Sequence, residues 1–223
     1  INNTNKKVFP PDTKVVVPHK EDYVIIIDGN RYITDYSGCR KPSKIQKIFF
    51  VLTDAPIIDF EKTFKRFPHL VEVEIETNLK EILDGAFEWA KNFERIKIPE
   101  GVEVIGKRAF ANCTKLKTIS LPRTLKEIDE EAFMGCISLQ EIKIPSGVKV
   151  ICKRAFKDGE SLLSVILPSN LSKIDDEAFA SCKSLQAVDI PDGVKVIGKR
   201  AFKDCESLSS VTLPSNLKEI DDE

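Results

Sequence analysis

The chain has 223 residues, of which 42% are hydrophobic and 31% charged, and its formal net charge is −1 at pH 7. This composition is sufficient for a continuous apolar core, while the absence of a basic excess argues against a nucleic-acid-binding surface. No apolar run approaches the roughly 20 residues of a membrane span, so this segment is not expected to insert into a membrane.

The first 44 residues carry a pattern of short strands. Residues 14–17 and 23–27 are apolar runs typical of strands. Asp28, Gly29 and Asn30 follow the second run and favour a hairpin turn, because Gly and Asn tolerate positive φ. Residues 31–36 then return antiparallel. We interpret residues 1–44 as a β-hairpin cap that shields the edge of the following fold, with a small adhesive module as the alternative.

Six Ala-Phe pairs recur at a fixed interval of 23 residues. They are Ala86-Phe87, Ala109-Phe110, Ala132-Phe133, Ala155-Phe156, Ala178-Phe179 and Ala201-Phe202. A fixed period of this length is typical of a solenoid, in which each unit buries its apolar face against its neighbours.

The repeating unit predicts a strand followed by a turn. In one copy, Leu116, Ile119 and Leu121 form an alternating L-x-x-I-x-L pattern that favours a strand with one buried face. Pro122 then ends the strand because proline lacks a backbone donor. The spacing from Phe133 to the small residue three positions later suits one helical turn. Weaker copies of the strand pattern lie upstream, at residues 45–50 and 70–75.

The pattern resembles the BspA-like subfamily of leucine-rich repeats, with the consensus L-x-x-I-x-[IL]-P-x-x-[LV]-x-x-I-x-x-x-A-F-x-x-C over roughly residues 70–223. The resemblance implies an α/β repeat fold: a right-handed solenoid with a parallel, concave β-sheet, short second strands such as residues 102–105, and helical turns on the convex side. We assign residues 45–223 to this solenoid, as about seven to eight coils. Because residues 221–223 stop just before the next Ala-Phe pair, we expect the natural protein to continue.

Charged residues before each Ala-Phe pair alternate in sign from coil to coil. The segments are Gly106-Lys107-Arg108, Asp129-Glu130-Glu131, Cys152-Lys153-Arg154, Asp175-Asp176-Glu177, Gly198-Lys199-Arg200 and Asp221-Asp222-Glu223. Stacked coils would therefore face each other with opposite charge, and a slip of one coil would set like charges together. A structural role in fixing the register is favoured over a charged stripe for a ligand.

Four of the six cysteines share one repeat position. Cys113, Cys136, Cys182 and Cys205 stand where Ala90 and Gly159 stand in other coils. Interchange with such small residues predicts a cramped, buried site filled by a free thiol. Disulfides between adjacent coils remain the alternative. The paired C-x-x-C spacing of a zinc site is absent.

Nothing in the repeat predicts catalysis, a cofactor or a metal site. Gly101, Gly106 and Lys107 fit G-x4-G-K, but Arg108 replaces the Ser or Thr that a phosphate-binding loop needs for magnesium. Residues 145–177 and 191–223 are identical at 26 of 33 positions. Such duplication argues against a site built from several different residues, so we predict that the chain is not an enzyme.

The outward positions of the predicted concave strands are the candidate protein-binding residues. They are Phe49, Glu72, Glu74, Arg95, Lys97, Thr118, Ser120, Glu141 and Lys143. Charge is concentrated toward the N-terminal half, from Phe49 to Lys97, which we take as the better patch. The alternative is that these are solvated strand residues without a ligand.

Proteins with BspA-like repeats are secreted or surface proteins implicated in adhesion to host matrix proteins or to other cells. The resemblance therefore implies a non-catalytic protein-binding module, extracellular or at the cell surface, with a protein ligand such as an extracellular-matrix protein. We expect a monomer. An intracellular scaffold or spacer without a dedicated ligand is the main alternative, and an accessory domain of an enzyme is a third.

Overall fold

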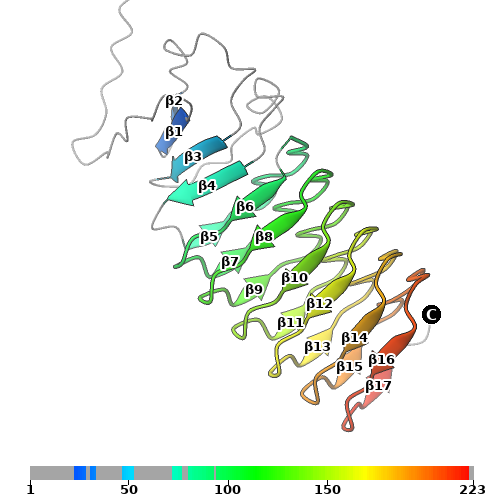
Figure 1. Ribbon diagram of the computed structural model, residues 1–223. Helices are drawn as coiled ribbons and strands as arrows, with labels where there is room; N and C mark the ends of the chain where they lie inside the picture. The colour runs from blue at the N-terminus through cyan, green and yellow to red at the C-terminus, as the bar shows by residue number, and fades with distance from the viewer. Residues whose placement is uncertain are drawn as a thin grey trace, which may run out of the picture.

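A computed structural model describes the backbone of residues 23–28, 31–33, 47–52 and 72–76, and both backbone and side chains of residues 80–92 and 94–220. Its elements are parallel strands stacked along one axis, apart from a hairpin at the N-terminal end (Figure 1). The predicted strand at residues 14–17 lies outside the described residues.

The N-terminal hairpin extends the sheet of the coils. Strands β1 (Tyr23–Asp28) and β2 (Arg31–Ile33) pair antiparallel, with Asp28 opposite Arg31. On its other side β1 pairs in parallel with β3 (Lys47–Leu52). The predicted strands at 23–27 and 45–50 are thus confirmed within two residues, as is the antiparallel return that begins at Arg31; the predicted turn residues 29 and 30 lie outside the described residues.

Each following coil contributes one strand to a face that we call the first sheet and a shorter strand to a second one; strand pairing is interrupted between β8 and β10 in the first sheet and between β9 and β11 in the second. The first-sheet strands are β4 (Glu72–Glu76), β6 (Arg95–Lys97), β8 (Thr118–Ser120), β10 (Glu141–Lys143), β12 (Ser164–Ile166), β14 (Ala187–Asp189) and β16 (Ser210–Thr212). The second-sheet strands are β5 (Glu81–Ile82), β7 (Val104–Ile105), β9 (Glu127–Ile128), β11 (Val150–Ile151), β13 (Lys173–Ile174), β15 (Val196–Ile197) and β17 (Glu219–Ile220). The fold is a parallel-sheet β-solenoid of about 6 turns with a 23-residue repeat.

The strands stack in register with the repeat. Arg95 pairs with Thr118, Ile96 with Ile119, and the same offset continues through the later coils. The central residue of a first-sheet strand points inward, as Ile142 does with 3% of its surface exposed, while its two neighbours face solvent. The alternating sequence pattern therefore sets which side of each strand enters the core.

A column of phenylalanine rings forms the centre of the core. The five rings from Phe87 to Phe179 are almost fully buried, and Phe202 is half-buried at the end of the column. Neighbouring ring centroids from Phe87 to Phe202 are 4.9, 5.2, 5.4, 5.3 and 5.4 Å apart, and the rings are nearly parallel. The separation is close to the spacing of adjacent strands, so each ring packs directly on the ring of the next coil.

The expected helical turn around each Ala-Phe pair is not seen in the described coils, which contain tight turns there. The residue before each Ala, such as Arg108, has positive φ, as does the residue four positions later, such as Asn112. The non-glycine residues with φ between 53 and 62° are Trp89, Arg108, Asn112, Glu131, Arg154, Asp158, Glu177, Ser181, Arg200 and Asp204. A left-handed residue at this interval prevents an α-helix from continuing.

Hydrogen bonding explains why the turn replaces the helix. Alternate amides stay within the coil: the N–H of Ala109 donates to Gly106 O at 3.1 Å. The amides between them leave the coil: the N–H of Phe110 donates to Ala132 O of the next coil at 2.7 Å. Half of the turn's donors therefore join neighbouring coils, whereas an α-helix would use every donor internally.

Three of the four repeated cysteines are buried, as the sequence predicts, and Cys205 in the last described coil is half-buried. The Sγ atoms of Cys113, Cys136 and Cys182 each donate to the carbonyl oxygen of a phenylalanine in the preceding coil, at 3.1, 3.2 and 3.3 Å. All described cysteines, which also include Cys152 and Cys205, are free thiols. Burial raises the pKa of Cys113 and Cys182, and it raises the pKa of Cys152 to about 11.

The buried thiols should react slowly in the folded protein. Since the thiolate is the reactive form, Cys113 and Cys182 are expected to react with Ellman's reagent far more slowly in the native protein than after denaturation. The denatured chain should then show all six thiols of the sequence. A titration of the denatured, unreduced protein that finds fewer than six would show that disulfides form.

Among the described residues, no helix is long and apolar enough to cross a membrane.

Candidate functional site

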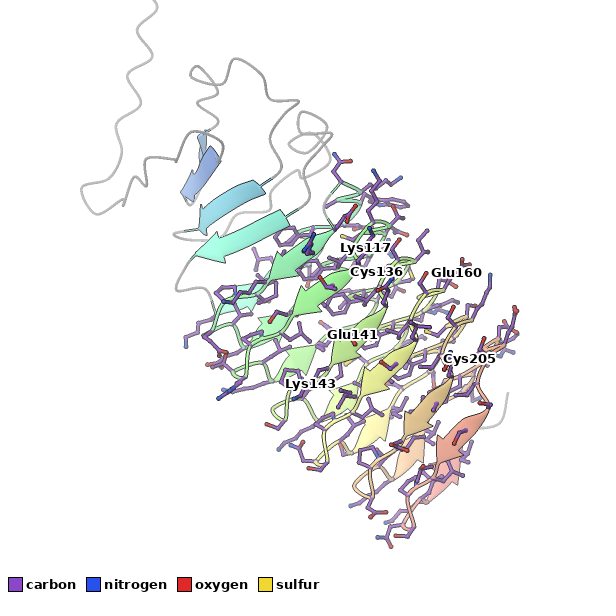
Figure 2. The ribbon with its side chains drawn as sticks, in the orientation of Figure 1. Lys117, Cys136, Glu141, Lys143, Glu160 and Cys205 are labelled. Carbon is purple, nitrogen blue, oxygen red and sulfur yellow. The ribbon has the colours of Figure 1, made fainter. Side chains whose placement is uncertain are left out.

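The outward face of the first sheet presents side chains in straight rows, because the strands are stacked in register. We call these the 95 row and the 97 row, after their first described members. The 95 row contains Arg95, Thr118, Glu141, Ser164, Ala187 and Ser210, and the 97 row contains Lys97, Ser120, Lys143, Ile166, Asp189 and Thr212. All twelve side chains are exposed. Figure 2 shows Glu141 and Lys143 projecting from β10.

Six of the nine candidate residues lie in these two rows: Arg95, Lys97, Thr118, Ser120, Glu141 and Lys143. For the other three, only the backbone is described. Glu72 pairs with Arg95, and Glu74 pairs with Phe49 on one side and Lys97 on the other. The backbone register therefore continues both rows toward the N-terminus, with acidic positions beside basic ones.

A third row, the 94 row, flanks the 95 row on its N-terminal side. It contains Glu94, Lys117, Gln140, Leu163, Gln186 and Ser209. Lys117 Nζ donates to Glu94 Oε2 at 2.8 Å, and this hydrogen bond lowers the pKa of Glu94. Together the three rows offer hydroxyl, amide and charged groups suited to protein recognition. Within the described part of the chain, no group of three metal-ligating side chains is assembled.

Sequence reasoning did not single out an apolar interruption in these rows. Leu163 in the 94 row is 47% exposed, and Ile166 in the 97 row is 57% exposed. The other described coils have Glu, Lys, Gln or Ser in place of Leu163, and Lys, Ser, Asp or Thr in place of Ile166. This difference between coils is visible in the sequence and could have identified the site. It shows that the exposed apolar side chains of the face lie at β12 and the residue before it.

The predicted charge alternation appears on the turn side of the solenoid, away from these rows, as a ladder of ion pairs. Arg108 contacts Glu88 and Glu131 at 2.6 Å each, joining three successive coils. Arg154 continues the ladder, at 3.6 Å from Glu131 and 2.7 Å from Glu177. These groups are mostly only partly exposed and are paired between coils, as the alternating charge predicts; their role in fixing the register stays a prediction.

Acid should weaken this ladder. Hydrogen bonds from Arg154 and then Lys157 lower the pKa of Glu177 from 4.5 to about 2. Because the folded pKa lies below the unfolded one, the stabilisation is fully present above pH 4.5 and is lost as the pH falls through about 2. We expect Glu177 to contribute about 1–2 kcal/mol to this loss, since solvent screens a partly exposed pair.

Urea unfolding between about pH 5 and pH 2 measures the effect. Glu177→Gln should be less stable than the parent at pH 5, and most of the difference should be lost by pH 2. Glu141→Gln is the control, because Glu141 is exposed and forms no ion pair with a described residue. Equal pH dependence in the parent and the Glu177 variant would contradict the assignment.

Comparison with protein families identifies the repeat. Residues 58–186 and 126–223 match the BspA type leucine rich repeat region, in six copies. No curated protein sequence matches the chain.

Solved structures of similar fold include bacterial repeat proteins. A leucine rich cell surface protein from Faecalibacterium prausnitzii A2-165 is 30% identical with a TM-score of 0.60, and the match covers 75% of this chain and 42% of that protein. A leucine-rich repeat protein from Bacteroides ovatus ATCC 8483 is 27% identical with a TM-score of 0.48, over 75% of this chain and 46% of that protein. The chain thus spans less than half the length of both.

Proposed function

This chain belongs to the BspA-type leucine-rich-repeat family, and from that premise we propose that it is a non-catalytic protein-binding module of a secreted or cell-surface protein. Its ligand would be a protein of the extracellular matrix or of another cell. The binding surface would be the first-sheet face, including the candidate residues from Phe49 to Lys143. The similar protein from Faecalibacterium prausnitzii is described as a cell surface protein, which supports this location.

The observation that carries the proposal is a difference in charge pairing between two faces of the solenoid. On the turn side, charges are used in pairs between coils, as at Arg108 and Glu131. On the first-sheet face, Glu141 and Lys143 form no ion pair with a described residue. Unpaired polar groups in regular rows on a rigid sheet suit recognition of another protein.

An intracellular scaffold without a dedicated ligand is the second candidate. The observation that favours it is that the five described cysteines are free thiols, which is usual in a reducing compartment. Their burial in the core offers another reason for the absence of disulfides, so the surface-protein proposal is preferred.

Binding of the purified chain to an immobilised matrix panel that includes fibronectin and fibrinogen tests the proposal. We expect saturable binding that weakens at high salt, because exposed charges contribute to the contact. The paired reversal Arg95→Glu and Lys97→Glu should weaken it by about tenfold or more, and Glu72→Lys with Glu74→Lys tests the adjoining positions. Lys203→Glu, an exposed position on the turn side, is the control.

Binding that is unchanged by either pair of reversals would exclude the N-terminal part of the face as the ligand site. A folded chain that binds no matrix protein would favour the scaffold function.

A further inference from the structure

The 97 row has a self-complementary charge pattern around its apolar member. Lys143 on β10 pairs with Ile166 on β12, and Asp189 on β14 follows Ile166 at the same repeat offset. The row therefore runs from a base through an exposed aliphatic side chain to an acid. Turning such a row end for end places acid on base and apolar on apolar.

The 94 row has the same kind of symmetry about β12. In the 94 row, exposed Leu163 lies between Gln140 and Gln186, and backbone hydrogen bonds join Leu163 to both neighbours. In the 95 row, Ser164 occupies the centre, and its neighbours Glu141 and Ala187 differ, so this row adds no matched contact. A reversed copy would thus set leucine against leucine and amide against amide, and two amides can hydrogen-bond to each other in either orientation.

We propose that the partner of this face is a second copy of the chain, docked sheet to sheet about a two-fold axis that runs parallel to the strands and over β12. The inference rests on the proposed function in that it uses the same binding face, and it names the partner. It replaces the monomer that the sequence predicts with a symmetric dimer, whose two halves use identical patches.

The geometry of the solenoid allows the rows of two copies to match along their length. Figure 1 shows the first-sheet strands of the coils following one another in a single line. Strands in both copies are about 4.8 Å apart, and packed sheets lie about 10 Å apart, within reach of facing side chains. About the β12 axis, Lys143 meets the partner's Asp189 and Ile166 meets the partner's Ile166. The base–acid contact occurs twice in each dimer.

The charges also select the register of this contact. With the axis moved to β10, Lys143 would face the partner's Lys143, and Glu141 would face the partner's Glu141. With the axis moved to β14, Asp189 would face the partner's Asp189. Each of these shifts opposes like charges, which is unfavourable in an interface. The β12 axis avoids both oppositions and brings the two apolar centres together.

Both charged groups are available for the contact. Lys143 forms no ion pair within residues 80–92 and 94–220, and Asp189 accepts only a hydrogen bond from Thr212 Oγ1, at 2.8 Å, in that part of the chain. Docking would also cover Leu163 and Ile166, whose present exposure is unfavourable in water.

Sedimentation velocity of the full chain, from about 1 to about 300 µM, measures self-association over the range expected of a weak contact. The parent should shift from monomer to dimer within this range. Lys143→Asp and Asp189→Lys should each raise the dissociation constant by about tenfold or more, because each sets two like-charge pairs in the interface. Lys203→Asp makes the same charge change at an exposed position on the turn side, away from the docking face, and should leave the dissociation constant unchanged.

Combining the two charge reversals, in a mixture or in one chain, is the decisive experiment. An equimolar mixture of the Lys143→Asp and Asp189→Lys proteins should form a mixed dimer, since each aspartate then faces a lysine. The double variant should likewise recover dimerisation. Neither recovery follows from damage to the fold, and circular dichroism of each variant checks that it is folded.

A parent chain that stays monomeric at every concentration would overturn the inference. So would a dimer that persists in both single-reversal variants. A mixture of the two variants that forms no dimer would also overturn it. Matrix proteins are absent from this experiment. A monomer that still binds the matrix panel would therefore overturn the self-docking inference alone, whereas a dimer that binds no matrix protein would count against the matrix ligand alone.

Discussion

Replacing Phe133 with alanine is expected to lower the free energy of unfolding by about 3–5 kcal/mol, the range for a buried phenylalanine. The Phe133 ring is 1% exposed and stacks on Phe110 at 5.2 Å and on Phe156 at 5.4 Å. Truncation would leave a cavity between two rings whose backbones are held by hydrogen bonds between coils, since Phe110 N donates to Ala132 O and Phe156 N donates to Ala178 O. Urea unfolding followed by circular dichroism measures the change.

Phe202→Ala is the matched control. Phe202 is half-buried and has a described ring on one side only, Phe179 at 5.4 Å. The same truncation there should cost markedly less, because one stacking contact is lost instead of two and the site is open enough to collapse. Equal losses at the two positions would show that the ring column does not determine the stability of the central coils.

Replacing Gly147 with alanine is expected to destabilise the fold by about 2–3 kcal/mol, the cost of forcing extra volume into a packed site. A Cβ added there would lie 2.1 Å from the carbonyl oxygen of Leu125 and 3.1 Å from its carbon. Both are backbone atoms of the preceding coil, so the coils themselves would have to separate. Thermal and urea unfolding of the variant measure the effect.

Gly159→Ala is the control for this substitution. Its Cβ would lie 3.0 Å from Phe156 O and 3.5 Å from Cys182 Sγ. Other coils already accommodate a side chain at the same repeat position, as Ala90 and Cys113 show. We therefore expect a change of under about 1 kcal/mol, helped by the lower entropy of the unfolded chain. A Gly147→Ala variant with an unchanged free energy of unfolding would mean that adjacent coils can separate at little cost.

The sequence predicts the strands, the buried cysteines and the ion-pair ladder because each depends on one repeat position meeting its own equivalent in the next coil. Strand alternation determines that Ile142 faces inward, and the period of 23 sets Arg108 beside Glu131. Such contacts follow from period and polarity alone. The first-sheet position of Glu141 and Lys143 follows for the same reason.

The turn and the apolar point of the candidate site do not follow from period and polarity. The choice between a helical turn and a tight turn depends on whether the amide of Phe110 finds an acceptor within its coil or in the next one, and the apolar pattern is the same in both cases. Ile166 sits at a position that is polar in the other described coils, so a consensus hides it. Ile166 becomes apparent only when the sequence of its own coil is compared with the sequences of the neighbouring coils.

The alternating sign of the ion-pair ladder constrains how such an array can change its length during evolution. A duplication of one coil would insert an arginine beside an arginine or a glutamate beside a glutamate, whereas a duplication of two coils restores the sequence of contacts seen from Glu88 to Glu177. The near-identical segments 145–177 and 191–223 are offset by two coils. Growth by unequal recombination would accordingly be tolerated in even steps, and an odd number of inserted coils would be selected against.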